Sequence, residues 1–147
     1  MKSVVINTLK KYEPVKSEKI SSLTLSQLQS KSESLKRLLG FMMEENSSLK
    51  YRLSEVLKEK FDNNMLVEAE NYQSYFIKED ELIGLLRNDI AIIDKGMKRI
   101  ENETGVEIRV IDKKLKSLHK HITTAGNQFC KLRLNFIKYL KNNSLIC

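Results

Sequence analysis

The chain has 147 residues, of which 41% are hydrophobic and 31% charged, and its formal net charge is +7 at pH 7. This balance is typical of a folded helical protein and argues against a chain that is disordered throughout. One proline and five glycines are few for a protein built from strands and turns. We therefore expect an all-α protein with an N-terminal arm over residues 1–19 and a helical bundle or coiled-coil domain over residues 20–147.

A first long helix is expected over about residues 21–62. It begins near Ser21, Ser22 or Thr24, because hydroxyl side chains cap the free amides of a helix. Residues alternately three and four positions apart then form a mostly apolar row, which we call a seam, and such a seam needs partner helices to cover it. The first seam contains Leu28, Ser32, Leu35, Leu39, Met42, Asn46, Leu49, Leu53, Val56 and Lys60.

Two features modify this first seam. Leu38, Leu57 and Phe61 widen its stripe, which favours a globular bundle over a strict two-stranded coiled coil. Asn46 occupies a seam position, where a single buried Asn fixes the register or oligomeric state of a coiled coil at some cost in stability. Asn46 is thus a candidate oligomer-register residue, and the alternative is an Asn at the edge of the bundle that faces water.

A second long helix is expected over about residues 64–103. The turn-forming sequence Asp62-Asn63-Asn64 coincides with a shift of the seam, so we place a turn there, with Asp62 or Asn63 as the cap. Glu79 is the one polar residue of this seam and marks either a hydrated position or a slight kink. The second seam contains Met65, Ala69, Tyr72, Phe76, Glu79, Ile83, Leu86, Ile90, Ile93, Met97 and Ile100.

A third long helix is expected over about residues 106–142. Gly105 follows the second helix closely, and a glycine just past a helix end is a common C-cap. The alternative is one uninterrupted helix with a skip residue. The sequence Asn142-Asn143-Ser144 ends the third helix. Its seam contains Ile108, Ile111, Leu115, Leu118, Ile122, Ala125, Phe129, Leu132 and Phe136, and Tyr139 or Leu140 extends it.

Three long helices joined by short turns indicate an up-down-up bundle. The layout is similar in kind to spectrin-type three-helix bundles and to helical adaptors or secretion chaperones, without the tryptophan that typically marks a spectrin repeat. Gly40, Gly84 and Gly126 each fall near the middle of an expected helix. They mark either a close approach of the helices, a shared bend, or a coincidence of position.

The charge is spread unevenly along the chain. Residues 64–105 carry nine acidic and five basic side chains, whereas residues 106–147 carry two acidic and nine basic ones. One interpretation is that the acidic second helix pairs with the basic third helix inside the bundle. The other is an outward-facing basic strip that contacts nucleic acid or another anionic partner. The strip consists of Arg109, Lys113, Lys116 and Lys120, spaced four, three and four residues apart.

No pattern in the sequence indicates a catalytic, cofactor-binding or metal-binding site. His119 and His121 project from different faces of a helix, and Cys130 and Cys147 form no ligand or disulfide framework. Without a signal sequence or an apolar run of membrane length, we expect a cytoplasmic protein.

The leading hypothesis is a non-enzymatic structural or interaction protein, a helical adaptor or assembly subunit. It would self-associate or dock on a larger complex through an exposed seam. The main alternative is a nucleic-acid-binding accessory protein that uses the third helix. Binding to an acidic membrane surface is the weakest hypothesis.

Overall fold

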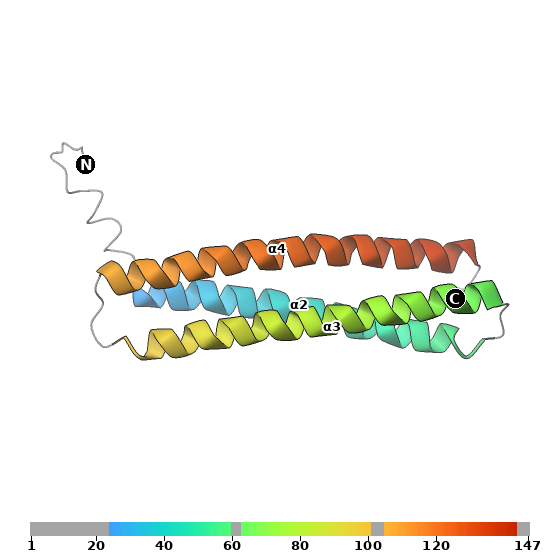
Figure 1. The fold of residues 1–147 in the computed structure, drawn as a ribbon, viewed down its shortest axis with the longest axis horizontal. Helices are drawn as coiled ribbons and strands as arrows, with labels where there is room; N and C mark the ends of the chain where they lie inside the picture. The colour runs from blue at the N-terminus through green and yellow to red at the C-terminus, as the bar shows by residue number, and fades with distance from the viewer. Residues whose placement is uncertain (1–23, 60–62, 101–104, 144–147) are drawn as a thin grey trace, which may run out of the picture. The chain divides into compact units, whose positions relative to one another are not determined.

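The computed structural model describes residues 24–59, 63–100 and 105–143, and these form three α-helices without a strand among them. The helices are α2 (Leu25–Val56), α3 (Asn63–Lys98) and α4 (Gly105–Asn142) (Figure 1). They pack against each other, so the expected all-α three-helix bundle is confirmed. The expected N-terminal arm at residues 1–19, the cap at Asp62 and the side chains of Lys60 and Phe61 lie outside the described residues.

The helix ends follow local side-chain chemistry. The Thr24 amide donates to Gln27 Oε1 at 2.8 Å and the Gln27 amide donates to Thr24 Oγ1 at 3.1 Å. This reciprocal pair is a capping box, and it confirms Thr24 among the three expected caps of α2. At the C-terminal end of α4, Asn143 Nδ2 donates to the Tyr139 carbonyl oxygen at 2.9 Å and closes the last turn of the helix.

Contacts between helices fix their relative directions. Met43 and Asn46 of α2 contact Arg87 and Phe76 of α3, so rising numbers in one helix meet falling numbers in the other. The chain therefore runs up, down and up, as expected. The ring contacts between α3 and α4 show the same antiparallel order: the Tyr72 ring lies 5.2 Å from the Tyr139 ring, and the Phe76 ring 5.1 Å from the Phe136 ring.

This antiparallel order makes one uninterrupted helix through Gly105 impossible. The expected break between the second and third helices is thus confirmed, but its predicted chemistry is wrong. Gly105 does not cap the end of α3, since α3 ends at Lys98 and Gly105 is the first residue of α4.

The helices contribute to two compact units, which we describe separately. Among the described residues, the first unit comprises residues 24–35, 89–100 and 105–119, and the second comprises residues 36–59, 63–88 and 120–143. In the first unit, the buried polar residue Ser32 donates from its hydroxyl to Asp94 Oδ1 at 2.6 Å. The buried apolar residues of this unit are all seam residues: Leu28, Leu35, Ile90, Ile93, Met97, Ile108, Ile111, Leu115 and Leu118.

The second unit has a core of seam residues with an aromatic cluster in it. The cluster consists of Tyr72, Phe76, Phe136 and Tyr139, with neighbouring ring centroids 5.1 to 6.2 Å apart. All four were expected in the seams or as an extension of them, and the structure adds that their rings meet in one cluster. The other buried apolar residues of this unit are Leu39, Met42, Leu49, Leu53, Val56, Ala69, Ile83, Leu86, Ile122, Ala125, Phe129 and Leu140.

Two expectations about packing are wrong. Leu38 does not widen the buried stripe, because its side chain is 42% exposed. Gly40, Gly84 and Gly126 do not mark a close approach of helices, because a Cβ atom added at any of them would meet nothing within 4 Å. The glycine at which an added Cβ does meet a neighbour is Gly96 of the first unit, where it would lie 3.6 Å from Ile111 Cδ1.

Candidate functional site

The basic strip lies on the outside of α4. Arg109, Lys113 and Lys116 belong to the first unit and Lys120 to the second, and all four side chains are exposed. Lys116 Nζ lies 3.0 Å from Asp112 Oδ2, one helical turn before it. The strip is therefore accessible as predicted, but an acidic neighbour partly offsets its charge.

Asp112 connects the strip to α2 within the first unit. Its second oxygen, Oδ1, accepts a hydrogen bond from Lys31 Nζ at 3.1 Å. Burial alone would raise the pKa of the Asp112 carboxyl, but the hydrogen bonds and positive charges of Lys116 and Lys31 outweigh burial and hold that pKa below its ordinary value. Asp112 thus stays ionised and holds two ammonium groups, one from each helix.

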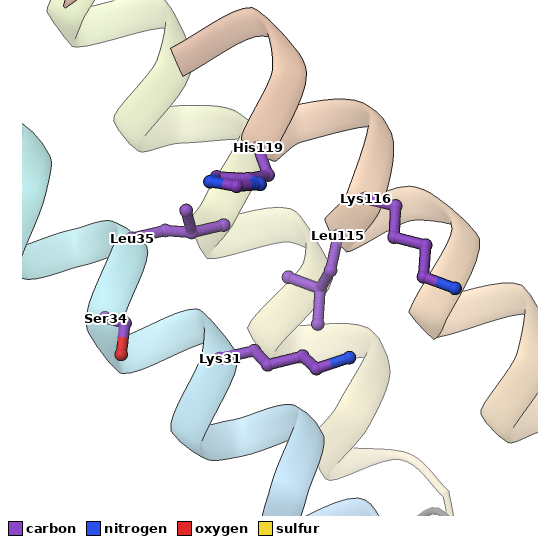
Figure 2. Close-up of a pocket in the computed structure, with 6 residues that line it drawn as sticks. All are labelled: Lys31, Ser34, Leu35, Leu115, Lys116 and His119. Atoms are coloured by element: carbon purple, nitrogen blue, oxygen red, sulfur yellow. The ribbon is translucent and has the colours of Figure 1, made fainter. Parts of the chain in front are cut away.

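A pocket opens between α2 and α4 beside this pair of ammonium groups. Its volume is about 280 Å³, and all its lining residues belong to the first unit. Figure 2 shows the His119 ring over Leu35 and the Lys31 side chain extending from α2 toward α4. The lining residues are Lys31, Ser34, Leu35, Leu115, Lys116 and His119.

The pocket combines an apolar base with basic groups around it. Leu35 and Leu115 are seam residues and are 7% and 2% exposed, so the pocket is floored by the edge of the core. Lys31, Lys116 and His119 are exposed around that floor. Such an arrangement can bind a molecule whose apolar part lies on the two leucines and whose negatively charged group lies beside the basic side chains.

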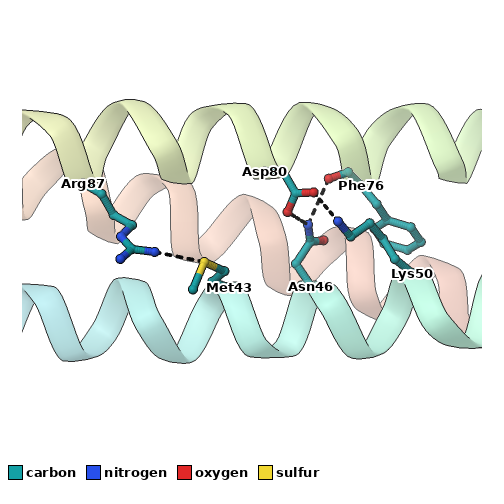
Figure 3. Close-up of polar contacts among 6 residues, drawn as sticks. All are labelled: Met43, Asn46, Lys50, Phe76, Asp80 and Arg87. Atoms are coloured by element: carbon teal, nitrogen blue, oxygen red, sulfur yellow. Dashed lines mark hydrogen bonds and ion pairs between the residues drawn. The ribbon is translucent and has the colours of Figure 1, made fainter.

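The second unit contains a buried polar contact at the predicted register residue. Asn46 is fully buried, so the alternative of an Asn facing water is wrong. Its Nδ2 group donates to the Phe76 carbonyl oxygen at 2.9 Å and to Asp80 Oδ1 at 2.7 Å. Asp80 Oδ2 also accepts from Lys50 Nζ, which completes a network from α2 to α3 (Figure 3).

This network pairs α2 with α3 in one register within the chain, since a shift of either helix would separate Asn46 from both acceptors. Figure 3 also shows Arg87 directed at Met43, with 3.0 Å between the Arg87 Nη1 and Met43 Sδ atoms. The role of Asn46 in an oligomer stays a prediction.

Glu79 adds a second buried polar side chain to this unit. It is 9% exposed, and its Oε1 atom has no hydrogen-bond partner. Burial raises the pKa of the Glu79 carboxyl, and the neighbouring charge of Asp80 raises it further. The Glu79 Oε1 atom therefore lies within the bundle, while the two interpretations made from sequence, a hydrated position or a slight kink, stay predictions.

The ion pairs also bear on the two interpretations of the charge distribution. α3 does lie beside α4 in the second unit, as the ring contacts show. The interhelical pairs described here nevertheless involve α2: Lys50 with Asp80 of α3, Lys31 with Asp112 of α4, and Glu45 with Arg133 of α4 at 3.9 Å. Complementary charges therefore connect α2 with both α3 and α4.

Some members of this site could be found from sequence and others could not. The spacing of Asp112 and Lys116 is that of a helical ion pair, so their contact was accessible to sequence reasoning. Lys31 joins them only through the register of α2 against α4, and no sequence pattern gave that register. His119 is exposed, and its place at the pocket was missed from sequence.

Two features are absent from the described ranges. No helix there has an apolar stretch sufficient to cross a bilayer. Nor do three or more His, Cys, Asp or Glu side chains of residues 24–59, 63–100 and 105–143 converge on a point that would suit a metal ion. Comparison with protein-family models, curated proteins and solved structures gives no match to the chain.

Proposed function

We propose that the chain is a structural or interaction protein, a helical adaptor or assembly subunit that self-associates or docks on a larger complex. The seams are covered within the bundle, so the contact surface differs from the exposed seam expected from sequence. The observation that carries the proposal is the pair Leu38 and Phe41 on α2 in the second unit, whose side chains are 42% and 63% exposed.

Leu38 and Phe41 are three residues apart, so they are neighbours on the surface of α2. Large aromatic side chains left in water are costly for a free protein and are enriched at the centres of protein interfaces. The same unit exposes further large apolar side chains on α3 and α4, including Leu85 and Leu134. A helix surface of this kind supports contact with another protein surface.

The proposal is tested by recovering tagged full-length protein from its native host, with and without nuclease, and identifying bound proteins by mass spectrometry. A Leu38→Ser/Phe41→Ser variant should lose the partner or shift from oligomer to monomer in size-exclusion chromatography with light scattering. The control is Tyr51→Ser, which removes another exposed aromatic ring of α2. A wild-type monomer that captures nothing would contradict the proposal.

The alternative, binding of nucleic acid through α4, is supported by the exposure of all four strip residues. It predicts an affinity for DNA or RNA that falls steeply with salt, because each phosphate contact releases counterions. Replacing Arg109, Lys113, Lys116 and Lys120 by Glu should abolish retention on nucleic acid. The control variant makes the same change of charge at four other exposed lysines: Lys78, Lys95, Lys138 and Lys141. Equal retention of the two variants would exclude the strip as the contact.

A further inference from the structure

The pocket of the first unit has the size of a small-ligand site. Its volume of about 280 Å³ lies near the lower end of the range of about 300–1,000 Å³ for small-molecule pockets. Leu35 and Leu115 form an apolar base that water solvates poorly. A short aliphatic chain or a single aromatic ring suits a pocket of this size.

The two lysines at the pocket both pair with one carboxylate. Lys31 and Lys116 come from different helices, and both donate to the one carboxylate of Asp112, at 3.1 and 3.0 Å. An ammonium group has three hydrogens, and Asp112 takes one from each lysine, so each has donors left for another acceptor. The Asp112 geometry shows that these two ammonium groups can converge on a carboxylate.

The local charge selects the kind of anion. Lys31, Lys116 and Asp112 together carry one net positive charge, which a single negative charge balances. A multiply charged phosphate would meet the Asp112 carboxylate within the same cluster and would gain little from the leucine base. A monoanion with an apolar body satisfies both parts of the pocket.

We propose that the pocket lined by Lys31, Leu35, Leu115, Lys116 and His119 binds a small amphiphilic carboxylate, with its apolar body on the two leucines and its head group at the two lysines. This site is independent of the proposed protein-interaction function, since it involves none of the exposed residues of the second unit that carry that proposal. The ligand class is an aliphatic or aromatic monocarboxylate.

The test is a titration of the full-length, isotope-labelled protein with sodium octanoate, followed by amide chemical shifts in ¹H–¹⁵N NMR spectra. Saturable shifts are expected at Lys31, Ser34, Leu115, Lys116 and His119. 1-Octanol has the same apolar body without the charge and should bind about tenfold more weakly, because charge-assisted hydrogen bonds are lost.

Matched variants separate the site from general charge attraction. Lys31→Gln/Lys116→Gln should weaken octanoate about tenfold and change octanol less than twofold, and each Gln can still donate to Asp112 and preserve the fold. Lys95→Gln/Lys98→Gln changes the same charge at exposed positions of the first unit outside the pocket and should leave octanoate binding unchanged. Shifts located elsewhere, equal binding of octanoate and octanol, or equal effects of the two double variants would overturn the proposal.

Discussion

Glu79→Leu is expected to stabilise the protein. The wild-type carboxyl is 9% exposed, and its Oε1 atom is buried without a hydrogen-bond partner. An unsatisfied buried polar atom costs about 1–3 kcal/mol. Full burial of a Leu side chain contributes about 1.5–3 kcal/mol, of which the methylene groups of Glu79 already supply a part. Discounting for that part, we expect the free energy of unfolding to rise by about 2 kcal/mol at pH 7.5.

The pH dependence identifies the cause of this gain. The pKa of Glu79 is raised in the folded protein above its ordinary value of 4.5, first by burial and then by Asp80. Well below pH 4.5 the Glu79 carboxyl is neutral in both the folded and the unfolded protein, so folding buries no charge there. As pH rises above 4.5 the unfolded state loses its proton first, so wild-type stability falls until the pH passes the folded-state pKa.

Urea unfolding followed by circular dichroism at 222 nm, from pH 4 to pH 8, measures both effects. Glu79→Gln is the matched control: it removes the charge and the pH dependence but keeps a buried polar group, so its gain should be smaller than that of Glu79→Leu. The reasoning fails if Glu79→Leu is no more stable than wild type at pH 7.5. It also fails if the stability difference between wild type and Glu79→Gln does not grow from pH 4.5 upward.

Three other predictions use the same unfolding measurement. Phe76→Ala should lower the free energy of unfolding by about 3–5 kcal/mol, since the ring is fully buried and packs on Phe136; Ser74→Ala, exposed on the same helix, should change it by less than about 0.5 kcal/mol. Gly84→Ala should raise it by about 0.5–1 kcal/mol, because an added Cβ meets no atom within 4 Å. Asp112→Asn should lower it by about 0.5–1 kcal/mol at pH 7.

A different outcome would contradict each of these three predictions. A loss below about 1 kcal/mol for Phe76→Ala would mean that the aromatic cluster packs loosely, and a loss of stability for Gly84→Ala would mean that the site is crowded. The pKa of Asp112 is lowered from 3.8 in the folded protein, so the stability it contributes is present above pH 3.8 and is lost as pH falls through the folded-state pKa. An Asp112→Asn effect that persists unchanged at pH 2.5 would exclude the ion pairs as its source.

The seams could be predicted from sequence because periodicity determines which side of a long helix is apolar, and the helix directions because short turns join antiparallel neighbours. The seam residues of α2 from Leu28 to Val56 are all buried, including the polar Ser32 and Asn46. What periodicity does not give is the register between helices. The contacts of Asn46 with Phe76 and Asp80 follow from that register. The contact of Lys31 with Asp112 does too, and both were therefore missed.

The polar seam residues show why their consequences needed the structure. Ser32 and Asn46 occupy equivalent seam positions, and each donates a hydrogen bond to an aspartate of α3. Asn46 Oδ1 and Glu79 Oε1, at two of these seam positions, are nevertheless buried without a hydrogen-bond partner, and no hydrogen bond of the Glu79 side chain to another helix is described. A sequence pattern identifies all three as buried polar residues, and only the positions of neighbouring side chains decide whether burial is compensated.

The mixed charge of α2 explains how α4 keeps an accessible basic side. α2 uses Lys50 toward the acidic α3, and it uses both Lys31 and Glu45 toward α4. Asp112, one of the two acidic residues in 106–147, pairs with Lys31 and Lys116. Lys113 and Lys120 remain exposed on the outer side of the helix. α4 packs through its seam while most of its lysines lie exposed in solvent, where an anionic ligand or partner can reach them.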